Sequence, residues 1–169
     1  MAEARLATEA NLRFCRDLAC HFTTYRKHWG LSAGDGPGNA PALDTYRCYA
    51  PSGPVDGTAH LTATLGAVSH RPDAVLENLR NAEAEGASAA RGRYGFSNVN
   101  DRWVGRDMVG IDAGAAVLAL DNFLFHDRVR SAFHSLPSVQ RGLERMGFAP
   151  AEFAATMPAA LVTAERQAS

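Results

Sequence analysis

The chain has 169 residues, enough for one domain with a single buried core. Apolar residues make up 46% of it and charged residues 21%, which is the balance of an ordinary globular protein and argues against disorder. The formal net charge is -1 and no block of like charges occurs, so we expect neither nucleic acid nor an anionic membrane as a partner.

Cysteine and histidine usage gives no sign of a metal site or a disulfide framework. The three cysteines form no CxxC pair, and the six histidines show no ligand spacing. The N-terminal segment lacks the apolar stretch of a signal peptide. The longest apolar run, "GAAVLAL", is far shorter than the ~20 residues that span a bilayer. As written, the chain is expected to be cytoplasmic, and to be exported if it belongs to a longer precursor.

The first half of the chain combines a helix with a long loop. Helical spacing predicts a helix over residues 3–22, with an inward stripe of Leu6, Ala10, Phe14, Leu18 and Phe22. Residues 28–57 are rich in Gly and Pro and cannot form a regular element. They also carry Trp29, Tyr46 and Tyr49, which is typical of a packed functional loop rather than a spacer.

The second half is predicted to be helical around one further irregular stretch. Helices are expected over residues 58–68, capped by Asp56 or Thr58, and over residues 72–85, with Val75, Leu76, Leu79 and Ala82 inward. Residues 92–110 are irregular. A long helix is expected over residues 111–136 and a short one over residues 138–146. With no alternating strand pattern, the chain is interpreted as all-α with long loops. Residues 1–150 form the domain and residues 151–169 an alanine-rich tail.

Aromatic and polar side chains concentrate in three loops, over residues 24–37, 46–58 and 94–112. Aromatic faces beside carboxylates and amides suit a neutral, hydroxylated ligand such as a sugar, whose C–H faces pack on Trp or Tyr. The alternative is that these aromatics only fill the gaps between helix ends. Composition alone leaves both interpretations open.

Four motifs together point to a family. "WGLSAGDGP", "DGTAHLTATLGAVSHRPD", "YGFSNVNDRWVGRDMVGID" and "PSVQRGLERMGF" occur in this order and resemble the C-terminal part of the glycoamylase-like domain. That domain is the family of bacterial endo-β-1,2-glucanases, and a similar domain occurs in cyclic β-1,2-glucan synthases. The resemblance covers residues 10–148.

The resemblance implies a fold and a chemistry. The fold would be part of an (α/α)6 barrel, with long loops at one end forming a cleft for a β-glucan chain. The reaction would be inverting glycoside hydrolysis by two carboxylates, which in such enzymes lie about 6.5–9.5 Å apart. Neither a metal nor an organic cofactor is implied, and the partner is an oligo- or polysaccharide.

The matching positions give the candidate site residues. Asp112 matches the acid of the family's Ile-Asp-Gln-Gly-Pro segment and is the catalytic candidate. The substrate-binding candidates lie in the matching loops and are Trp29, Asp35, Asp56, Tyr94, Asn98 and Trp103.

Several positions depart from the family pattern. Asn98 stands where an acid is usual after "YGF", and Ala113-Gly114-Ala115 replace Gln-Gly-Pro. Asp121 replaces a glutamate. About five helices are predicted, whereas a complete barrel has twelve, and the upstream half that should hold the partner acid has no counterpart here.

Asp112 has two interpretations. A carboxylate at a helix N-terminus is held in its charged form, which suits a general base or a sugar-binding group. The alternative is an ordinary helix cap. For the whole chain, a β-glucan hydrolase therefore competes with two other hypotheses. One is a non-catalytic glycan-binding remnant that self-associates or pairs with a second chain completing the barrel. The other is a helical interaction domain without a ligand.

Overall fold

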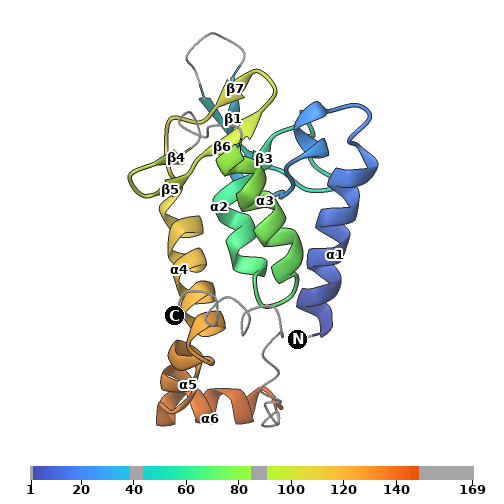
Figure 1. Cartoon of the computed structure of the whole chain (residues 1–169). Helices are drawn as coiled ribbons and strands as arrows, with labels where there is room; N and C mark the ends of the chain where they lie inside the picture. The colour runs from blue at the N-terminus through green and yellow to red at the C-terminus, as the bar shows by residue number, and fades with distance from the viewer. Residues whose placement is uncertain (1, 39–43, 85–90, 149–169) are drawn as a thin grey trace.

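The computed structural model describes residues 2–38, 44–84 and 91–148. The chain is mostly helical, with short strands gathered at one end and the last two helices at the other (Figure 1). The elements in chain order are α1 (Ala2–Asp17), η1 (Thr23–Arg26), β1 (Ala33–Pro37), β2 (Asp44–Cys48), β3 (Ala59–His60), α2 (Leu61–Thr64), η2 (Leu65–Ala67), α3 (Pro72–Ala84), β4 (Arg91–Gly92), β5 (Gly95–Phe96), β6 (Asn98–Asn100), β7 (Trp103–Val104), α4 (Gly110–Leu124), α5 (Arg128–His134) and α6 (Pro137–Arg145).

The core lies where α1, α2 and α3 meet the segments around Trp29 and Tyr49. Its buried members are Leu12, Cys15, Tyr25, Trp29, Leu31, Tyr49, Ala59, Leu61, Val68, Ala74, Val75, Ala82 and Val99. In Figure 1, α2 and α3 occupy the middle of the molecule, with α1 on one side and α4 on the other. This packing holds in place the helices beside the strand end, by which we mean the end of the molecule that carries β1 to β7.

The predicted inward stripes of α1 and α3 are confirmed except at single positions. In α1 the buried residues are Leu12 and Cys15, whereas Leu6 is 68% exposed. In α3 the inward stripe runs through Ala74, Val75, Asn78 and Ala82, and the predicted core residue Leu76 is exposed. Both helices are present as expected, and most of the predicted residues are buried or pack against the core: Phe14, Leu18, Phe22, Val75, Leu79 and Ala82. The segment after α1 continues as turns and η1 rather than as helix to residue 22.

The all-α prediction was wrong in one respect, because the described part of the chain contains three small antiparallel sheets. They pair β1 with β2, β6 with both β3 and β7, and β4 with β5. In β1 the buried positions are Gly34 and Gly36, so the strand has no hydrophobic alternation. A Cβ at residue 36 would lie 1.6 Å from the Tyr49 hydroxyl, and one at residue 34 would lie 2.9 Å from Asn98. Glycine permits this close approach.

The predicted helix over residues 58–68 is divided. Ala59 and His60 form β3, and only Leu61–Thr64 is α-helical before the 3₁₀ turn η2. His60 pairs with Asn98 across the sheet. Asp56 does not cap α2. Its carboxylate instead accepts hydrogen bonds from the Thr58 backbone N–H at 3.0 Å and the Thr58 hydroxyl at 2.6 Å.

The predicted helix over residues 111–136 breaks after Leu124. His126 and Asp127 adopt left-handed backbone conformations with φ of 54° and 60°. Asn122 stabilises the break, because its backbone carbonyl accepts from the Asp127 N–H and its side-chain oxygen accepts from the Arg130 N–H. Asn122 is thus a satisfied, half-buried amide at a helix end rather than a residue of a continuous helix. The last helix, α6, begins and ends within one residue of the prediction.

Candidate functional site

The strand end brings several predicted residues together. Asp35 lies in β1, and the Asn98 side-chain amide donates to the Asp35 backbone carbonyl at 2.9 Å, which ties β6 to the β1–β2 hairpin. The Asp35 carboxylate has no hydrogen bond or ion pair within the described ranges. It is half-buried. It is therefore available to accept hydrogen bonds from a ligand hydroxyl.

Asp112 lies in the first turn of α4, where Val109 rather than Asp112 is the N-cap residue. Burial raises the pKa of Asp112, and the nearby Ser32 hydroxyl opposes this effect without cancelling it. The direction is opposite to the expected one, because desolvation outweighs the helix dipole at this half-buried position. A raised pKa suits a carboxylic acid that donates a proton.

Ser32 is held firmly beside Asp112. Its backbone carbonyl accepts from the Tyr49 N–H at 3.2 Å. The neighbouring Leu31 exchanges two hydrogen bonds with the Asn11 side chain of α1, each at 3.0 Å. No pattern in the sequence singles out Ser32. Its place in the site follows only from its position near Asp112 in the structure.

Asp56 is fully engaged within its own loop. Besides the two bonds from Thr58, its carboxylate accepts from Arg47 at 2.7 Å and from the Tyr49 hydroxyl at 3.0 Å. These contacts connect β2 to the entry of β3. Asp56 is therefore a predicted substrate-binding residue whose carboxylate holds together the loop between residues 47 and 58.

The Trp29 ring points into the core rather than into solvent. The side chain is 6% exposed, and its Nε1 donates to the Ala74 carbonyl at 3.1 Å. Asn78 accepts from the Trp29 backbone N–H at 3.3 Å and donates to the Trp29 carbonyl at 3.2 Å. Asn78 also donates to Thr64 and contacts His28. Sequence reasoning missed this amide, although an Asn on the apolar side of a helix is a usable signal.

The remaining two aromatic candidates lie at the strand end. Trp103, in β7, donates from Nε1 to the Asp44 carboxylate at 2.9 Å and so joins β7 to the first residue of β2. Tyr94 lies in the turn between β4 and β5, is 70% exposed, and has the Arg93 guanidinium 5.3 Å from its ring centroid. Its ring is free to stack on a ligand, whereas Trp103 is half-buried.

His60 is a second buried polar residue that the sequence did not single out. It is 0% exposed, its ring centroid lies 5.0 Å from that of Tyr49, and neither ring nitrogen has a hydrogen-bond partner among the described residues. Burial lowers the pKa of His60 to about 4, against smaller opposing effects of the Gly30 carbonyl and Asp56. The imidazole is therefore neutral at physiological pH.

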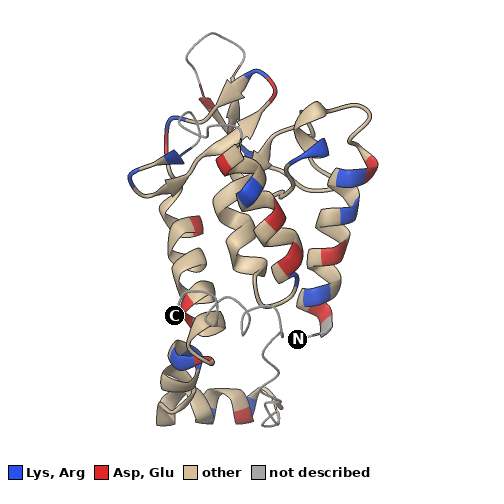
Figure 2. Cartoon of the chain, in the orientation of Figure 1, with Lys and Arg blue, Asp and Glu red and all other residues tan. Residues whose placement is uncertain are grey.

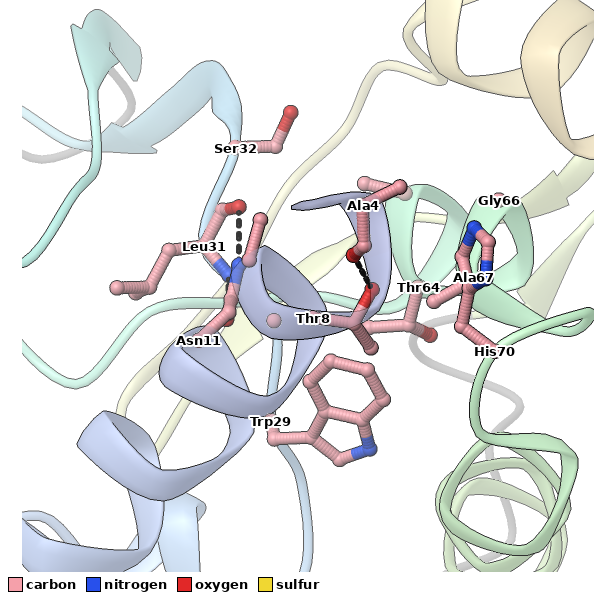
Figure 3. Close-up of a pocket in the computed structure, with 13 residues that line it drawn as sticks. Ala4, Thr8, Asn11, Trp29, Leu31, Ser32, Thr64, Gly66, Ala67 and His70 are labelled. Atoms are coloured by element: carbon pink, nitrogen blue, oxygen red, sulfur yellow. Dashed lines mark hydrogen bonds between the residues drawn. The ribbon is translucent and has the colours of Figure 1, made fainter. Parts of the chain in front are cut away.

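A pocket of about 380 Å³ lies beside Ser32, between α1 and the α2–η2 segment (Figure 3). Its walls include Ala4, Ala7, Ala63, Gly66 and Ala67. Three of its polar side chains are already bonded: Thr8 donates to the Ala4 carbonyl, Asn11 is bound to Leu31, and Thr64 donates to the Leu61 carbonyl. Trp29, Ser32 and His70 also line it. These small apolar walls leave few unbonded polar groups, whereas a sugar needs several free partners.

Within the described ranges no cluster of three or more His, Cys, Asp or Glu side chains could hold a metal ion. The helices found in those ranges are too short or too polar to cross a membrane. What the strand end offers a ligand is the Asp35 carboxylate, the Asp112 carboxyl group and the exposed Tyr94 ring, since the Asp56 carboxylate and the Asn98 amide are already bonded. Such groups can hydrogen-bond and stack on a neutral hydroxylated molecule.

Comparison with known proteins identifies the family. The family model "Glycoamylase", described as "putative glucoamylase", matches residues 1–137. An exo beta-1,2-glucooligosaccharide sophorohydrolase from Parabacteroides distasonis is 28% identical over 141 residues, which are 80% of this chain and 19% of that protein.

Solved structures show the same relationship. A protein from Bacteroides uniformis described as a "putative glucoamylase" aligns with a TM-score of 0.72 and 29% identity, over 82% of this chain and 32% of that one. The beta-1,2-glucanase from Parabacteroides distasonis aligns with a TM-score of 0.68 and 27% identity, over 81% of this chain and 19% of that one. The chain thus spans between about a fifth and a third of the length of these relatives. Since the family model covers most of its length, the chain belongs to the glycoamylase family.

Proposed function

We propose that this chain forms part of the catalytic site of a glycoside hydrolase that acts on β-1,2-linked glucan. The observation that carries the proposal is the placement of Asp112. It is a half-buried acid with a raised pKa in the first turn of α4. It lies close to Ser32, which immediately precedes the β1–β2 hairpin that also holds Asp35. The names of two relatives, a sophorohydrolase and a β-1,2-glucanase, support the choice of substrate.

In this proposal Asp112 is the general acid. It would donate its proton to the glycosidic oxygen as the C–O bond breaks, while a second carboxylate takes a proton from the attacking water. Because water attacks from the opposite face of the sugar, the anomeric configuration is inverted. The helices described here would form part of an (α/α)6 barrel, and the second carboxylate would come from the part of that fold outside this chain.

The strand end would bind the glucan chain. The free Asp35 carboxylate would accept hydrogen bonds from sugar hydroxyls, and the exposed Tyr94 ring would stack on a glucose face. Asn98 and Trp103 would support this surface rather than contact sugar through polar atoms, since the Asn98 amide is bound to Asp35 and the Trp103 Nε1 to Asp44.

The test is release of reducing ends from linear β-1,2-glucan by an active protein in which this chain is joined to the rest of the glycoamylase fold, since the second carboxylate would lie outside the chain. Activity should be lost in Asp112→Asn, which keeps the size of the side chain and removes its proton-donating function. The matched control is Asp17→Asn, the same change at a carboxylate that is 70% exposed near the end of α1, and it should leave the rate unchanged. Equal rates for wild type and Asp112→Asn would refute the role of Asp112.

A second candidate function is glycan binding without turnover. It is favoured by Asn98, because an amide stands where the family usually has an acid and is committed to a backbone hydrogen bond. A binding domain would be stabilised by β-1,2-glucooligosaccharide without releasing reducing ends. Self-association, or pairing with another chain, is the corresponding proposal for its partner.

A further inference from the structure

Tyr49 is a core residue that contacts the β1 segment on both sides of Asp35. Its side chain is 3% exposed. Just before β1, the Ser32 carbonyl accepts from the Tyr49 backbone N–H at 3.2 Å. Further along the strand, the Tyr49 hydroxyl lies so close to Gly36 that a Cβ there would be 1.6 Å from its oxygen. A single residue therefore contacts both the Ser32 end and the Gly36 end of the strand.

The alternation of β1 puts the Asp35 side chain on the opposite face of the strand. Successive side chains of a strand point to opposite faces, and in β1 the two glycines are buried whereas Asp35 is half-buried. The glycine face lies against Tyr49 at Gly36. At Gly34 it lies near the His60 ring, which would be 3.2 Å from a Cβ at that position. Glycine thus lets β1 lie directly on two buried rings, with Asp35 facing away from them.

The Tyr49 hydroxyl is itself held in place. It donates to the Asp56 carboxylate at 3.0 Å, and the same carboxylate oxygen accepts from Arg47 at 2.7 Å. Acidic and basic residues are interspersed at the strand end (Figure 2), and this ion pair joins two of them. Burial raises the pKa of Tyr49, so the hydroxyl keeps its proton and remains a donor. The loop that contains Asp56 therefore fixes the position of the Tyr49 ring under β1.

We propose that Tyr49 is a positioning residue, which fixes where β1 holds the Asp35 carboxylate relative to Ser32. The role of Asp35 as a sugar ligand rests on the proposed function. A group that binds a ligand must be held firmly, because a displacement of about 1 Å can remove most of its contribution. Asn98 holds the Asp35 backbone carbonyl through its 2.9 Å hydrogen bond, and Tyr49 sets how deeply the strand lies on the core.

The first test is amide hydrogen exchange in the full chain, with Tyr49→Phe as the variant. This change removes the hydroxyl and keeps the ring. The matched control is Tyr25→Phe, because Tyr25 is 2% exposed and its hydroxyl donates to the Thr58 carbonyl at 3.1 Å. In Tyr49→Phe, exchange at residues 33–36 should accelerate about tenfold more than exchange in α3. In Tyr25→Phe, any acceleration should be equal in the two segments. Equal acceleration in Tyr49→Phe would overturn the proposal.

The second test is titration calorimetry with a β-1,2-linked glucooligosaccharide. Tyr49→Phe should weaken binding by about fivefold, the effect of one lost hydrogen bond on a ligand-binding group, and Tyr25→Phe should bind like wild type. Because Tyr49 acts through Asp35, adding Tyr49→Phe to Asp35→Ala should cause no further loss. A general loss of folding would instead weaken both backgrounds equally.

The two tests separate this proposal from the proposed function. Faster exchange confined to β1, in a protein that binds no sugar, supports the positioning role of Tyr49 and counts against the proposed function. Sugar binding that Tyr49→Phe leaves unchanged, or weakens equally with and without the Asp35 carboxylate, would overturn the positioning role and leave the proposed function intact.

Discussion

The buried imidazole of His60 should make the stability of this protein fall steeply in mild acid. Burial lowers its pKa from the ordinary 6.5 to about 4, and the side chain is 0% exposed. Above pH 6.5 the ring is neutral in both the folded and the unfolded states, and His60 contributes no pH dependence. Below pH 6.5 the His60 ring binds a proton in the unfolded chain but stays neutral in the folded chain, because its folded-state pKa is about 4. The free energy of unfolding therefore falls as the pH falls towards 4.

The size of the effect follows from the pKa difference. Each pKa unit corresponds to about 1.4 kcal/mol, so the contribution of His60 between pH 7.5 and pH 4 is a loss of about 3 kcal/mol. For a domain with about 5–15 kcal/mol of total stability, such a loss is easily measured. Most of it should appear between pH 6 and pH 4.

The assay is urea unfolding at pH 7.5, 6, 5 and 4, for wild type and for His60→Leu. Leucine is apolar and does not titrate, and removing the ring breaks no hydrogen bond, because neither ring nitrogen has a partner among the described residues. The difference in unfolding free energy between the two proteins should shift by about 3 kcal/mol in favour of His60→Leu between pH 7.5 and pH 4. Parallel pH curves for the two proteins would refute the reasoning.

Three further predictions concern other positions. Asn78→Ala should destabilise the chain by about 2–4 kcal/mol in urea unfolding, because it leaves the buried polar groups of Trp29 without partners; a loss below 1 kcal/mol would contradict this. Asp112→Asn should raise the melting temperature at pH 7, since burial raises the pKa of this acid, and the advantage should disappear below pH 3; a lower melting temperature at pH 7 would show that the charge is stabilised instead. His126→Gly should stabilise the α4–α5 junction by up to about 1 kcal/mol, because the residue is left-handed with φ of 54°, and a decrease in stability would mean that the side chain makes a needed contact.

The sequence patterns predicted the helices better than the strand end. α1, α3 and α6 follow from helical spacing, from Pro72 and Pro137 in first turns, and from Gly147 after the last helix. The strands could not be predicted because they are two to five residues long and because β1 buries glycines. The break after Leu124 depends on the hydrogen bonds of Asn122 and on the left-handed backbone of His126 and Asp127. Neither feature can be inferred from helical periodicity.

The candidate site was only partly predictable. The motifs located Asp35, Asn98 and Asp112, and the structure brings these loops to one end. The roles of Asp56 and Trp29 depend on long-range partners, such as Arg47 for Asp56 and Asn78 for Trp29, which no local pattern identifies. The direction of the Asp112 pKa shift was mispredicted, because the sequence shows a helix start but not how deeply the carboxyl group is buried.

The most direct measurement is a thermal melt with and without β-1,2-glucooligosaccharides, followed by circular dichroism. A matched series of β-1,3-linked oligosaccharides serves as the control. At about 100 times the dissociation constant a ligand stabilises the folded state by about 2.7 kcal/mol, which for a domain of this size raises the melting temperature by about 5–10 °C. We expect such a rise with the β-1,2 series, a smaller one with the β-1,3 series, and none for a chain in which both Asp35 and Tyr94 are replaced by alanine. A transition unmoved by any sugar, or moved equally by both series, would contradict a β-1,2-glucan site at the strand end.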